Sequence, residues 1–301
     1  MSRQILVIGD VMTDVIVMPE GPIVKGSDRR AKVRSRPGGS GANQAVWLGA
    51  MGAEAALVAR VGVDDRVMYE NYFRGLGVVP FLAGDKELPS GVLVTIVDPD
   101  GERSFLTDRG ANLHLCADDL PESLLKGLGT VMVSGYSLFA PGPRAAVTDF
   151  LALAKASGVS VAVDPASEGF LQEVGPDRFV SWTAGADWIF ANQDEAVALC
   201  GAVELDVQMR LLGAHYANVV IKRGRLGAAL GGRHGVRLTM EAPVVVVVDS
   251  TGAGDAFAAA FLAAQVDGAA VEAALAEGIA AGAKAVRSIG GQPPLPARLA
   301  E

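Results

Sequence analysis

From about residue 128 onward, short apolar runs without polar alternation are separated by longer helix-like segments. Strands that are apolar on both faces need cover on both faces, and helices that connect parallel strands supply it. The second half of the chain therefore predicts a parallel sheet between two layers of helices. The predicted strands are Thr130–Gly135, Ser160–Pro165, Trp188–Asn192, Asn218–Gly224 and Val244–Asp249, with Gln4–Asp10 as a first strand.

A second group of β segments does not fit this alternation. Residues 91–108 read as a hairpin, because two strand-like runs flank the turn Asp98–Gly101, whose Pro and Gly favour tight turns. Together with segments near 11–18 and 29–36, this hairpin predicts a small β-sheet that projects from the main domain. The expected fold is α/β, a three-layer αβα domain with a doubly wound, mostly parallel central sheet, and residues 1–301 are expected to form one domain.

Composition narrows the class of protein. Half of the 301 residues are hydrophobic, enough for a sizeable core, and the net charge is −8 without a basic block. Nucleic acids and anionic membranes are therefore poor partners. Two cysteines and three scattered histidines give no disulfide framework and no metal-ligand spacing. With no long apolar signal region and no run of membrane-spanning length, we expect a soluble, cytoplasmic protein.

The turn Gly252-Ala253-Gly254-Asp255 stands between a valine run and an alanine-rich segment. Small residues permit a ligand to approach the backbone, and the free N–H groups of a helix start attract anions. Such a pocket stabilises the charge of a transferred phosphoryl group, while Asp255 at its lip is placed to accept the proton of an attacking hydroxyl. Taken alone, the same turn is also ordinary helix-entry chemistry.

Other polar groups converge on the same edge of the predicted sheet. Asp164, Asn192, Lys222–Gly224 and Asp249–Asp255 all follow the carboxyl ends of predicted strands, where ligands of open α/β sheets bind. The chain has neither the G-x-x-x-x-G-K-[ST] pattern of a P-loop nor the G-x-G-x-x-G fingerprint of dinucleotide binding. A nucleotide is therefore held in a different way, and a dehydrogenase is disfavoured.

The order of these motifs resembles that of the ribokinase family, the PfkB-type carbohydrate kinases. Residues 38–46, GGSGANQAV, resemble its N-terminal signature, and residues 249–257, DSTGAGDAF, its C-terminal signature. Residues 192–195, NQDE, match its N-x-x-E element, and residues 222–227, KRGRLG, its nucleotide loop. The resemblance covers essentially the whole chain. It implies a ribokinase-like fold and ATP-dependent transfer of the γ-phosphate to a hydroxymethyl group of a sugar or similar compound.

The resemblance also implies roles for individual residues, with ATP and Mg²⁺ as cofactors. The implied catalytic residues are Asp255 as general base and Gly252, Ala253 and Gly254 as the anion hole. The implied substrate-binding residues are Asp14, Gly38, Gly39, Asn43 and Arg109. The implied ATP-binding residues are Asn192, Lys222, Gly224, Gly227 and Gly254. Glu195 is implied to act on magnesium through water. A possible potassium site is implied at Asp249, Thr251, Ala285, Ser288 and Gly290, from which Pro294 departs by lacking a hydroxyl. Each of these residues also has an ordinary structural explanation.

In this family a small β-sheet forms a lid over the sugar, which excludes water from the reaction. The resemblance therefore assigns the segments 11–18, 29–36 and 91–108 to a lid, and makes that lid the candidate surface for a homodimer. The expected binding partner is a small sugar or sugar-like molecule.

Two departures leave the acceptor open. Ser40 stands where ribokinases carry lysine, and Ser134–Ser137 lacks their acidic residue, so ribose is disfavoured. A hexose, a keto-deoxy sugar acid and a nucleoside stay as candidates. An acid would use basic residues, for which Arg29, Arg30, Arg34 and Arg109 are available. A nucleoside would use aromatic stacking, for which Tyr136, Trp47 and Phe105 are available. The alternatives to a sugar kinase are a nucleoside kinase of the same fold and a non-catalytic ligand-binding relative, which the intact Asp255 argues against.

Overall fold

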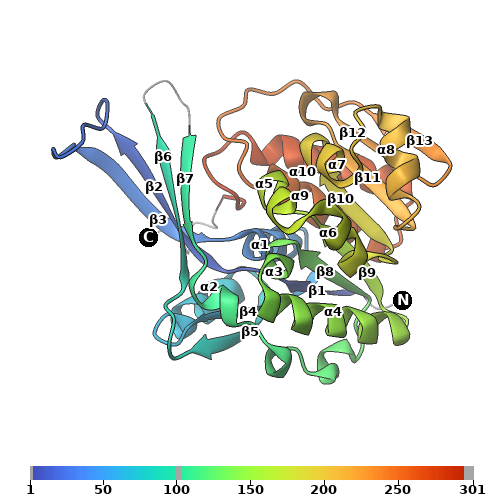
Figure 1. Ribbon diagram of the computed structural model, residues 1–301, viewed down its shortest axis with the longest axis horizontal. Coiled ribbons are helices and arrows are strands. Elements are labelled where there is room, and N and C mark those ends of the chain that lie inside the picture. Colours follow the sequence, from blue (N-terminus) through green and yellow to red (C-terminus); the bar gives the residue numbers. More distant parts are fainter. Residues whose placement is uncertain (1–2, 99–102, 295–301) are drawn as a thin grey trace.

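The computed structural model describes residues 3–98 and 103–294, and a large sheet forms its centre (Figure 1). The strands of this sheet are β1 (Gln4–Ile8), β4 (Glu54–Gly62), β5 (Val78–Asp85), β8 (Thr130–Ser134), β9 (Ser160–Asp164), β10 (Trp188–Asn192), β11 (Asn218–Lys222), β12 (Ala228–Gly232) and β13 (Gly235–Met240). Their order is β13-β12-β11-β10-β9-β8-β1-β4-β5. Every neighbouring pair from β11 to β5 is parallel, whereas β12 pairs antiparallel with both β11 and β13. The predicted mostly parallel sheet is confirmed.

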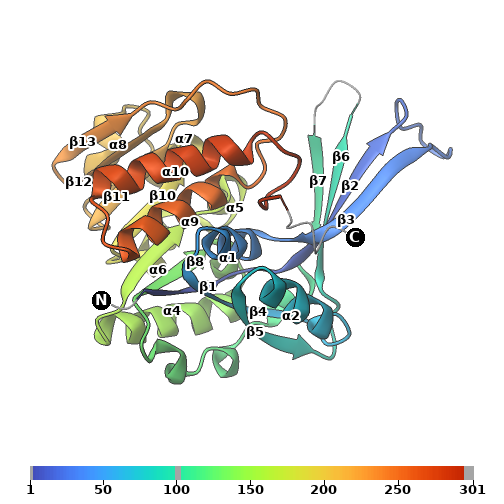
Figure 2. The same cartoon turned by 180° about the vertical axis from the view of Figure 1, so that it is seen from behind.

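Helices cover both faces of this sheet (Figure 2). On one face lie α1 (Ser40–Ala50), α2 (Arg66–Gly75), α9 (Ala253–Val266) and α10 (Val271–Ala285). On the other lie α4 (Pro141–Ala156), α5 (Glu168–Val174), α6 (Pro176–Thr183), α7 (Gln193–Cys200) and α8 (Leu205–Leu212), and a short α3 (Tyr136–Phe139) follows β8. Within the described residues, no helix has the length and apolar character needed to span a bilayer.

The alternation of side chains along β1 explains the two cores. Ile5 and Val7 belong to the apolar cluster under α1 and α9, whereas Leu6 and Ile8 belong to the cluster on the opposite face. Because successive side chains of a strand point to opposite faces, a strand covered on both sides is apolar throughout. The non-alternating sequence of such strands is thus a direct result of their position.

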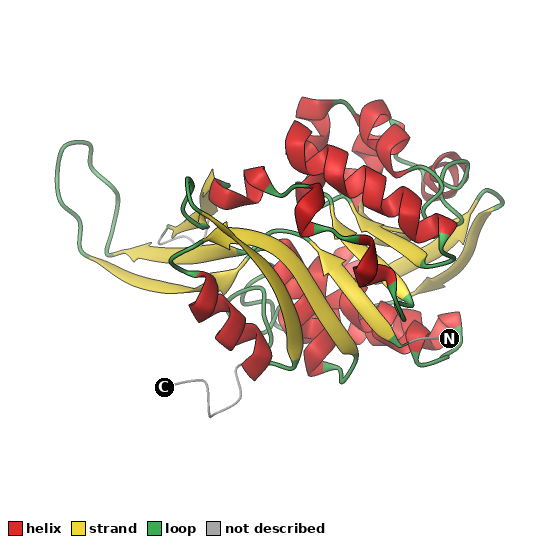
Figure 3. Ribbon diagram, turned by 90° about the horizontal axis from the view of Figure 1, so that it is seen from below, coloured by secondary structure: helices red, strands yellow, loops and turns green. Residues whose placement is uncertain are grey.

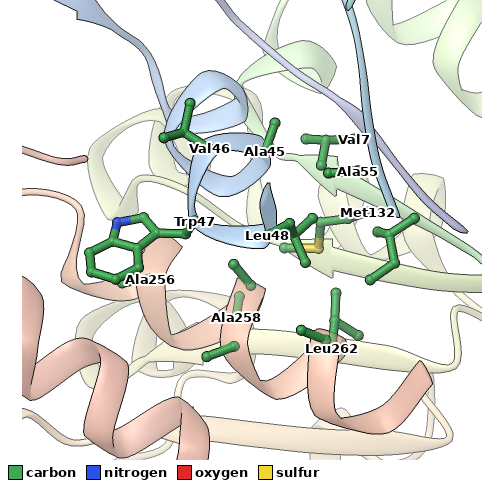
Figure 4. Packing of buried hydrophobic residues seen from close by; sticks show 14 of the residues in the cluster. Val7, Ala45, Val46, Trp47, Leu48, Ala55, Met132, Ala256, Ala258 and Leu262 are labelled. Atoms are coloured by element: carbon green, nitrogen blue, oxygen red, sulfur yellow. The ribbon is translucent and has the colours of Figure 1, made fainter. Parts of the chain in front are cut away.

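Small residues bring α1 very close to β1 and α9. In Figure 4, Ala45 and Trp47 of α1 lie with Val7 and with Ala256 and Ala258 of α9 in one packed core. A Cβ built on Gly41 of α1 would lie 2.5 Å from the Cα of Gly9, just after β1. The backbone of α1 lies against the backbone of Gly9 at this point, so there is no room for a side chain at position 41. This close packing brings the first turn of α1 beside the first turn of α9.

A second, four-stranded sheet has the order β3-β2-β6-β7, formed by β2 (Met12–Pro19), β3 (Ala31–Gly38), β6 (Gly91–Val97) and β7 (Arg103–Asp108). β2 pairs antiparallel with β3 and parallel with β6, and β6 and β7 form a hairpin. Figure 3 shows these strands extending away from the helical layers. The small additional sheet that the sequence predicted is confirmed, while residues 99–101 of the predicted hairpin turn lie outside the described residues.

The prediction of a buried strand at Val244–Asp249 is wrong. This segment forms no strand, and the exposed fractions of Val244, Val246 and Val247 are 103%, 82% and 63%. The reason is that the hairpin of β12 and β13, which the sequence interpretation missed, already occupies the edge beside β11. β-branched residues suit a strand only where a pairing edge is open. The valine segment instead leads the chain across the surface to α9.

Replacing Gly41 with alanine tests the contact between α1 and β1. Because the new Cβ meets backbone atoms of Gly9, we expect Gly41→Ala to lower the free energy of unfolding by about 1–3 kcal/mol. Gly169→Ala in α5 is the control: its nearest neighbour would lie 3.9 Å away, so it is expected to be neutral or to stabilise by up to about 1 kcal/mol. Chemical denaturation measures both. Equal stabilities of the two variants would contradict the close-packing argument.

Candidate active site

Asp255 lies in the first turn of α9, and this helix begins directly after Gly252, which adopts the left-handed φ of 73°. Its half-buried carboxylate accepts hydrogen bonds from three side chains of the first turn of α1. The donors are Ser40 Oγ at 2.8 Å, Asn43 Nδ2 at 3.1 Å and Gln44 Nε2 at 3.1 Å. Burial, followed by the negative charge of Asp164, raises the pKa of Asp255 to about 7. The carboxyl group is therefore fixed in place and able to exchange a proton near neutral pH.

Several buried polar atoms around this carboxylate have no hydrogen-bond partner in the described structure. They are Asp14 Oδ1, Asn43 Oδ1, Gln44 Oε1 and Ser134 Oγ. Because buried polar atoms are nearly always paired, a group of this kind indicates a place for a polar ligand. The carboxylate and carboxamide oxygens are acceptors, which suit the hydroxyl groups of a sugar.

Asp14 comes from β2, at the point where the second sheet leaves the main body. Burial, opposed by the positive charge of Arg36, raises the pKa of Asp14 to about 6. A side chain at Gly38 would collide with the carboxylate of Asp14, and Gly39, with φ of 96°, passes so close to the Asp10 carbonyl that a Cβ would lie 2.7 Å from its oxygen. Both glycines are thus required by the close approach of the chain to Asp14 and Asp10.

A lysine lies beside the start of α9. Lys222 Nζ is 2.7 Å from Asp164 Oδ2, and it lies 3.0 Å from the position of a Cβ built on Gly254. Burial lowers the pKa of Lys222, but the carboxylates of Asp164 and Glu195 outweigh this effect and raise it. The ammonium group therefore stays charged next to the first turn of α9. Asp164 was not among the predicted site residues, although its place at the end of a predicted strand indicated the correct edge of the sheet.

Glu195 and Asn192 form a reciprocal cap at the start of α7. Asn192 Oδ1 accepts the N–H of Glu195 at 2.8 Å, and Glu195 Oε2 accepts the N–H of Asn192 at 2.7 Å. Glu195 is nevertheless buried, and this burial raises its pKa to about 7 against the pull of Lys222. Within the described residues, no group of three His, Cys, Asp or Glu side chains is arranged to hold a metal. A magnesium ion here would therefore take most of its ligands from water and phosphate.

The loop after Lys222 is a tight turn between β11 and β12. Gly224 and Gly227 have φ values of 55° and 80°, and the N–H of Arg223 bonds to the carbonyl of Gly227 at 2.8 Å. Both glycines adopt a conformation that residues with a Cβ rarely tolerate. The loop carries the predicted nucleotide-binding glycines at the same sheet edge as Lys222.

The segment after α10 folds back toward α1 and the second sheet. Asp249 Oδ1 accepts the N–H of Thr251 at 2.8 Å, and Asp249 Oδ2 accepts that of Gly290 at 2.7 Å. The N–H of Ser288 bonds to the carbonyl of Ala285 at 3.3 Å. The residues considered for a potassium site are therefore close together, although both carboxylate oxygens of Asp249 already accept backbone N–H groups.

Two residues considered for substrate contact differ in their surroundings. Arg109 Nη2 donates to the carbonyl of Tyr136 at 3.1 Å, and its guanidinium lies 5.1 Å from the centre of the Tyr136 ring. Trp47, in contrast, is buried and donates its Nε1 hydrogen to the carbonyl of Gly291 at 2.9 Å. Trp47 is therefore not available to stack on a base, and the prediction that it could do so is wrong.

Ser40 contacts Asp255, although the sequence marked it only as a departure from ribokinases. The signal that could have identified this contact was a hydroxyl group within the glycine-rich signature.

Comparison with known proteins gives one consistent result. The family model of the pfkB family carbohydrate kinases matches residues 2–298. The ATP-dependent ribose-1-phosphate kinase of Halopiger xanaduensis is 30% identical over 283 residues, which cover 91% of this chain and 87% of that protein. The chain spans about half (54%) of the bifunctional protein HldE of Shewanella sp. (strain ANA-3), to which it is also 30% identical over 84% of its own length.

Solved structures agree with this result. Arabidopsis thaliana ribokinase complexed with ribose and ATP is 26% identical, with a TM-score of 0.77 and coverage of 96% of this chain and 94% of that one. A putative ribokinase II of E. coli in complex with ATP and Mg²⁺ has a TM-score of 0.85 at 22% identity, with coverage of 96% and 94%. The chain therefore belongs to the PfkB family of carbohydrate kinases, enzymes that transfer a phosphoryl group to an alcohol.

Proposed function

We propose that this protein transfers the γ-phosphoryl group of MgATP to a hydroxymethyl group of a sugar or sugar-like acceptor, with Asp255 as the general base. The observation that carries the proposal is the position of Asp255 in the first turn of α9, held by Ser40, Asn43 and Gln44. A base works when it lies within reach of the reacting hydroxyl and titrates near the working pH. The raised pKa of Asp255 meets the second condition.

On the phosphate side, the N–H groups of Gly252, Ala253 and Gly254 form the anion hole and Lys222 adds a full positive charge. Charge that spreads over the transferred phosphoryl group is stabilised by donors fixed in advance. We assign Asn192, Gly224 and Gly227 to the nucleotide phosphates. Glu195 would hold magnesium through its waters, and the ion supplies charge neutralisation on the phosphate oxygens. The potassium site at Asp249, Thr251, Ala285, Ser288 and Gly290 stays a proposal.

On the acceptor side, Asp14, Gly38, Gly39, Asn43 and Arg109 are assigned to the substrate. The unpaired oxygens of Asp14 and Asn43 accept hydrogen bonds from sugar hydroxyls, and this orients the reacting hydroxyl toward Asp255. The Halopiger relative is named a ribose-1-phosphate kinase, and this name supports a sugar as the acceptor class. A nucleoside is the second candidate, because Tyr136 lies beside Arg109 at the site.

The second sheet is assigned the function of a lid. β2 and β3 continue directly from Asp10 and into Gly39, so a tilt of the sheet would reach the acceptor and exclude water. Its face opposite Asp14 is largely apolar, with Val33 and Leu106 exposed by 60% and 61%. That face is the proposed surface of a homodimer.

Removal of the proposed base gives the first test. We expect Asp255→Asn to bind ATP normally and to lose turnover by about 10²–10⁴-fold, since the amide cannot accept the proton. Asp267→Asn, in the exposed position that ends α9, is the control and is expected to keep normal turnover. A coupled assay of ADP release across sugars, sugar acids and nucleosides measures both. Near-normal turnover of Asp255→Asn would refute the role of this residue.

The pH dependence of kcat/KM gives a second test. Because burial raises the pKa of Asp255 to about 7, the base is protonated and inactive below that pH. We expect kcat/KM to fall about tenfold per pH unit below pH 7 and to level off above it. Asp14 and Glu195 are two other carboxyl groups with a raised pKa. Asp14→Asn and Glu195→Gln should show the same decrease of kcat/KM below pH 7, because Asp255 is intact in both variants. A profile that is flat from pH 5 to 8 would contradict the assignment.

Glu195→Gln tests the proposed link to magnesium. Glutamine keeps an oxygen for the N–H of Asn192, so the cap and the melting temperature should be preserved. Loss of the charge is expected to raise the Mg²⁺ concentration for half-maximal activity about tenfold or more. Asp194→Asn, an exposed acid in the same turn of α7, should leave the Mg²⁺ dependence unchanged. The same Mg²⁺ requirement in both variants would exclude this function of Glu195.

A further inference from the structure

The segment 289–292, which follows α10 and turns toward the second sheet (Figure 2), reaches the proposed anion hole. A Cβ built on Gly252, the residue before α9, would lie 2.3 Å from the Cα of Gly291, so the two backbones are in direct contact. A Cβ built on Gly291 would in turn lie 2.3 Å from Asn43 Nδ2, which donates to the carboxylate of Asp255. The segment therefore packs against the start of α9 and against one of the groups that hold Asp255.

Two aromatic side chains of the main body hold this segment. Trp47 of α1 donates its Nε1 hydrogen to the carbonyl of Gly291 at 2.9 Å, and the hydroxyl of Tyr72 in α2 donates to Gln292 Oε1. Trp47 and Gln292 are buried, and the loss of a hydrogen bond between buried groups costs more than the loss of an exposed one. These two contacts fix the end of the segment to the helices of the main body.

A third contact comes from the second sheet. Arg36 of β3 is half-buried, and its Nη1 donates to the carbonyl of Ile289 at 2.8 Å. A Cβ built on Gly290, which has a φ of 97°, would lie 1.2 Å from Arg36 Nη2. The guanidinium thus fills the place that a side chain at Gly290 would need. The N–H of Gly290 bonds to Asp249 Oδ2 at 2.7 Å, so the residue under the guanidinium is itself fixed.

Arg36 is directed to this segment rather than to the acceptor. The strand register places it opposite Asp14, the residue assigned to the acceptor. Its guanidinium nevertheless bonds to Ile289, and Asp14 Oδ1 has no hydrogen-bond partner among the described residues. The arginine therefore has a structural partner on the side of the site where phosphate is transferred.

We propose that Arg36 is a positioning residue for phosphoryl transfer: through Ile289 it holds the segment 289–292 against the start of α9. The inference rests on the proposed function, in which the N–H groups of residues 252–254 bind the transferred phosphoryl group. Backbone donors stabilise that charge when they are fixed in advance, and a displacement of about 1 Å can lower the rate about 100-fold. Because Arg36 belongs to β3, the same bond links the position of the second sheet to the geometry of the anion hole.

Nucleotide binding tests this inference without any acceptor. The probes are MgADP and MgAMP-PNP, an ATP analogue whose γ-phosphate is not transferred, and each is titrated into the protein by calorimetry. In the proposed reaction, only the γ-phosphate reaches the start of α9. We expect Arg36→Gln to weaken the binding of AMP-PNP about tenfold and to leave that of ADP unchanged. Arg36→Lys keeps a positively charged donor and should restore most of the affinity.

Arg29→Gln is the matched control. Arg29 also donates to a backbone carbonyl, that of Pro22 at 3.1 Å, but this bond lies within the connection between β2 and β3. The substitution removes the same charge and the same kind of bond, and it should leave the binding of both nucleotides unchanged. Circular dichroism confirms that every variant is folded at the temperature of the titration. Unchanged AMP-PNP binding in Arg36→Gln, or an equal loss of ADP and AMP-PNP binding, would overturn the inference.

Turnover gives a second measurement, with the acceptor that the ADP-release assay selects from ribose, ribose 1-phosphate, fructose, gluconate and adenosine. At pH 8, above the raised pKa values of Asp14 and Asp255, Arg36→Gln should lower kcat about 10- to 100-fold and leave the KM for the acceptor unchanged. A raised KM for the acceptor at normal kcat would mean that Arg36 binds the acceptor, which contradicts the inference. If no compound is phosphorylated, the nucleotide titration decides alone.

The tryptophan in contact with the segment reports its position directly. Protein labelled with 5-fluorotryptophan contains three ¹⁹F nuclei, at Trp47, Trp182 and Trp188, and Trp47→Phe identifies the first resonance. We expect this resonance to shift in Arg36→Gln and to stay in place in Arg29→Gln. An unshifted resonance in Arg36→Gln would show that the arginine does not hold the segment.

The kinase proposal and this inference fail in different ways. If the kinase proposal is wrong, Asp255→Asn turns over as fast as the wild type. If only the inference is wrong, Asp255→Asn loses turnover while Arg36→Gln keeps normal kcat and normal binding of AMP-PNP.

Discussion

The hydrogen bonds between the first turn of α1 and the carboxylate of Asp255 are the contact on which the candidate site depends. They form only because α1 and α9 pack through alanine and glycine, which lets two helix starts from distant parts of the chain approach each other. Ser40, Asn43 and Gln44 donate to Asp255 and leave two carboxamide oxygens unpaired. The same helix therefore fixes the proposed base and offers acceptors to the substrate. A shift of either helix would lose both functions together.

Charge is distributed unevenly around this contact. Burial raises the pKa of Asp14, Glu195 and Asp255 into the range from about 6 to about 7, so each of these groups changes charge close to physiological pH. Lys222 supplies a full positive charge at the start of α9, where backbone N–H groups already favour an anion. In the proposed reaction, this local arrangement would attract phosphate to a protein that is acidic overall.

The two sheets carry residues for different parts of the proposed reaction. The carboxyl ends of β9, β10 and β11 and the start of α9 carry Asp164, Asn192, Lys222 and Asp255, which lie on the phosphate side of the proposed reaction. The second sheet carries Asp14, which lies on the acceptor side of the proposed reaction. Because β2 and β3 join the main body at Asp10 and Gly39, a movement of that sheet would change the proposed acceptor site and leave the proposed phosphate site in place.

The sequence alone determined the parallel sheet, the additional small sheet and the residues of the two signature motifs, because apolar strands without alternation and glycine turns are local patterns. Only the tertiary structure decided the rest. The valine run at Val244–Asp249 has full strand propensity, yet the hairpin of β12 and β13 closes the edge where it would pair. Trp47 has the chemistry to stack on a base but is buried against Gly291. The pairing of Lys222 with Asp164, and of Ser40 with Asp255, joins residues 58 and 215 positions apart, and such contacts follow from packing rather than from any local pattern.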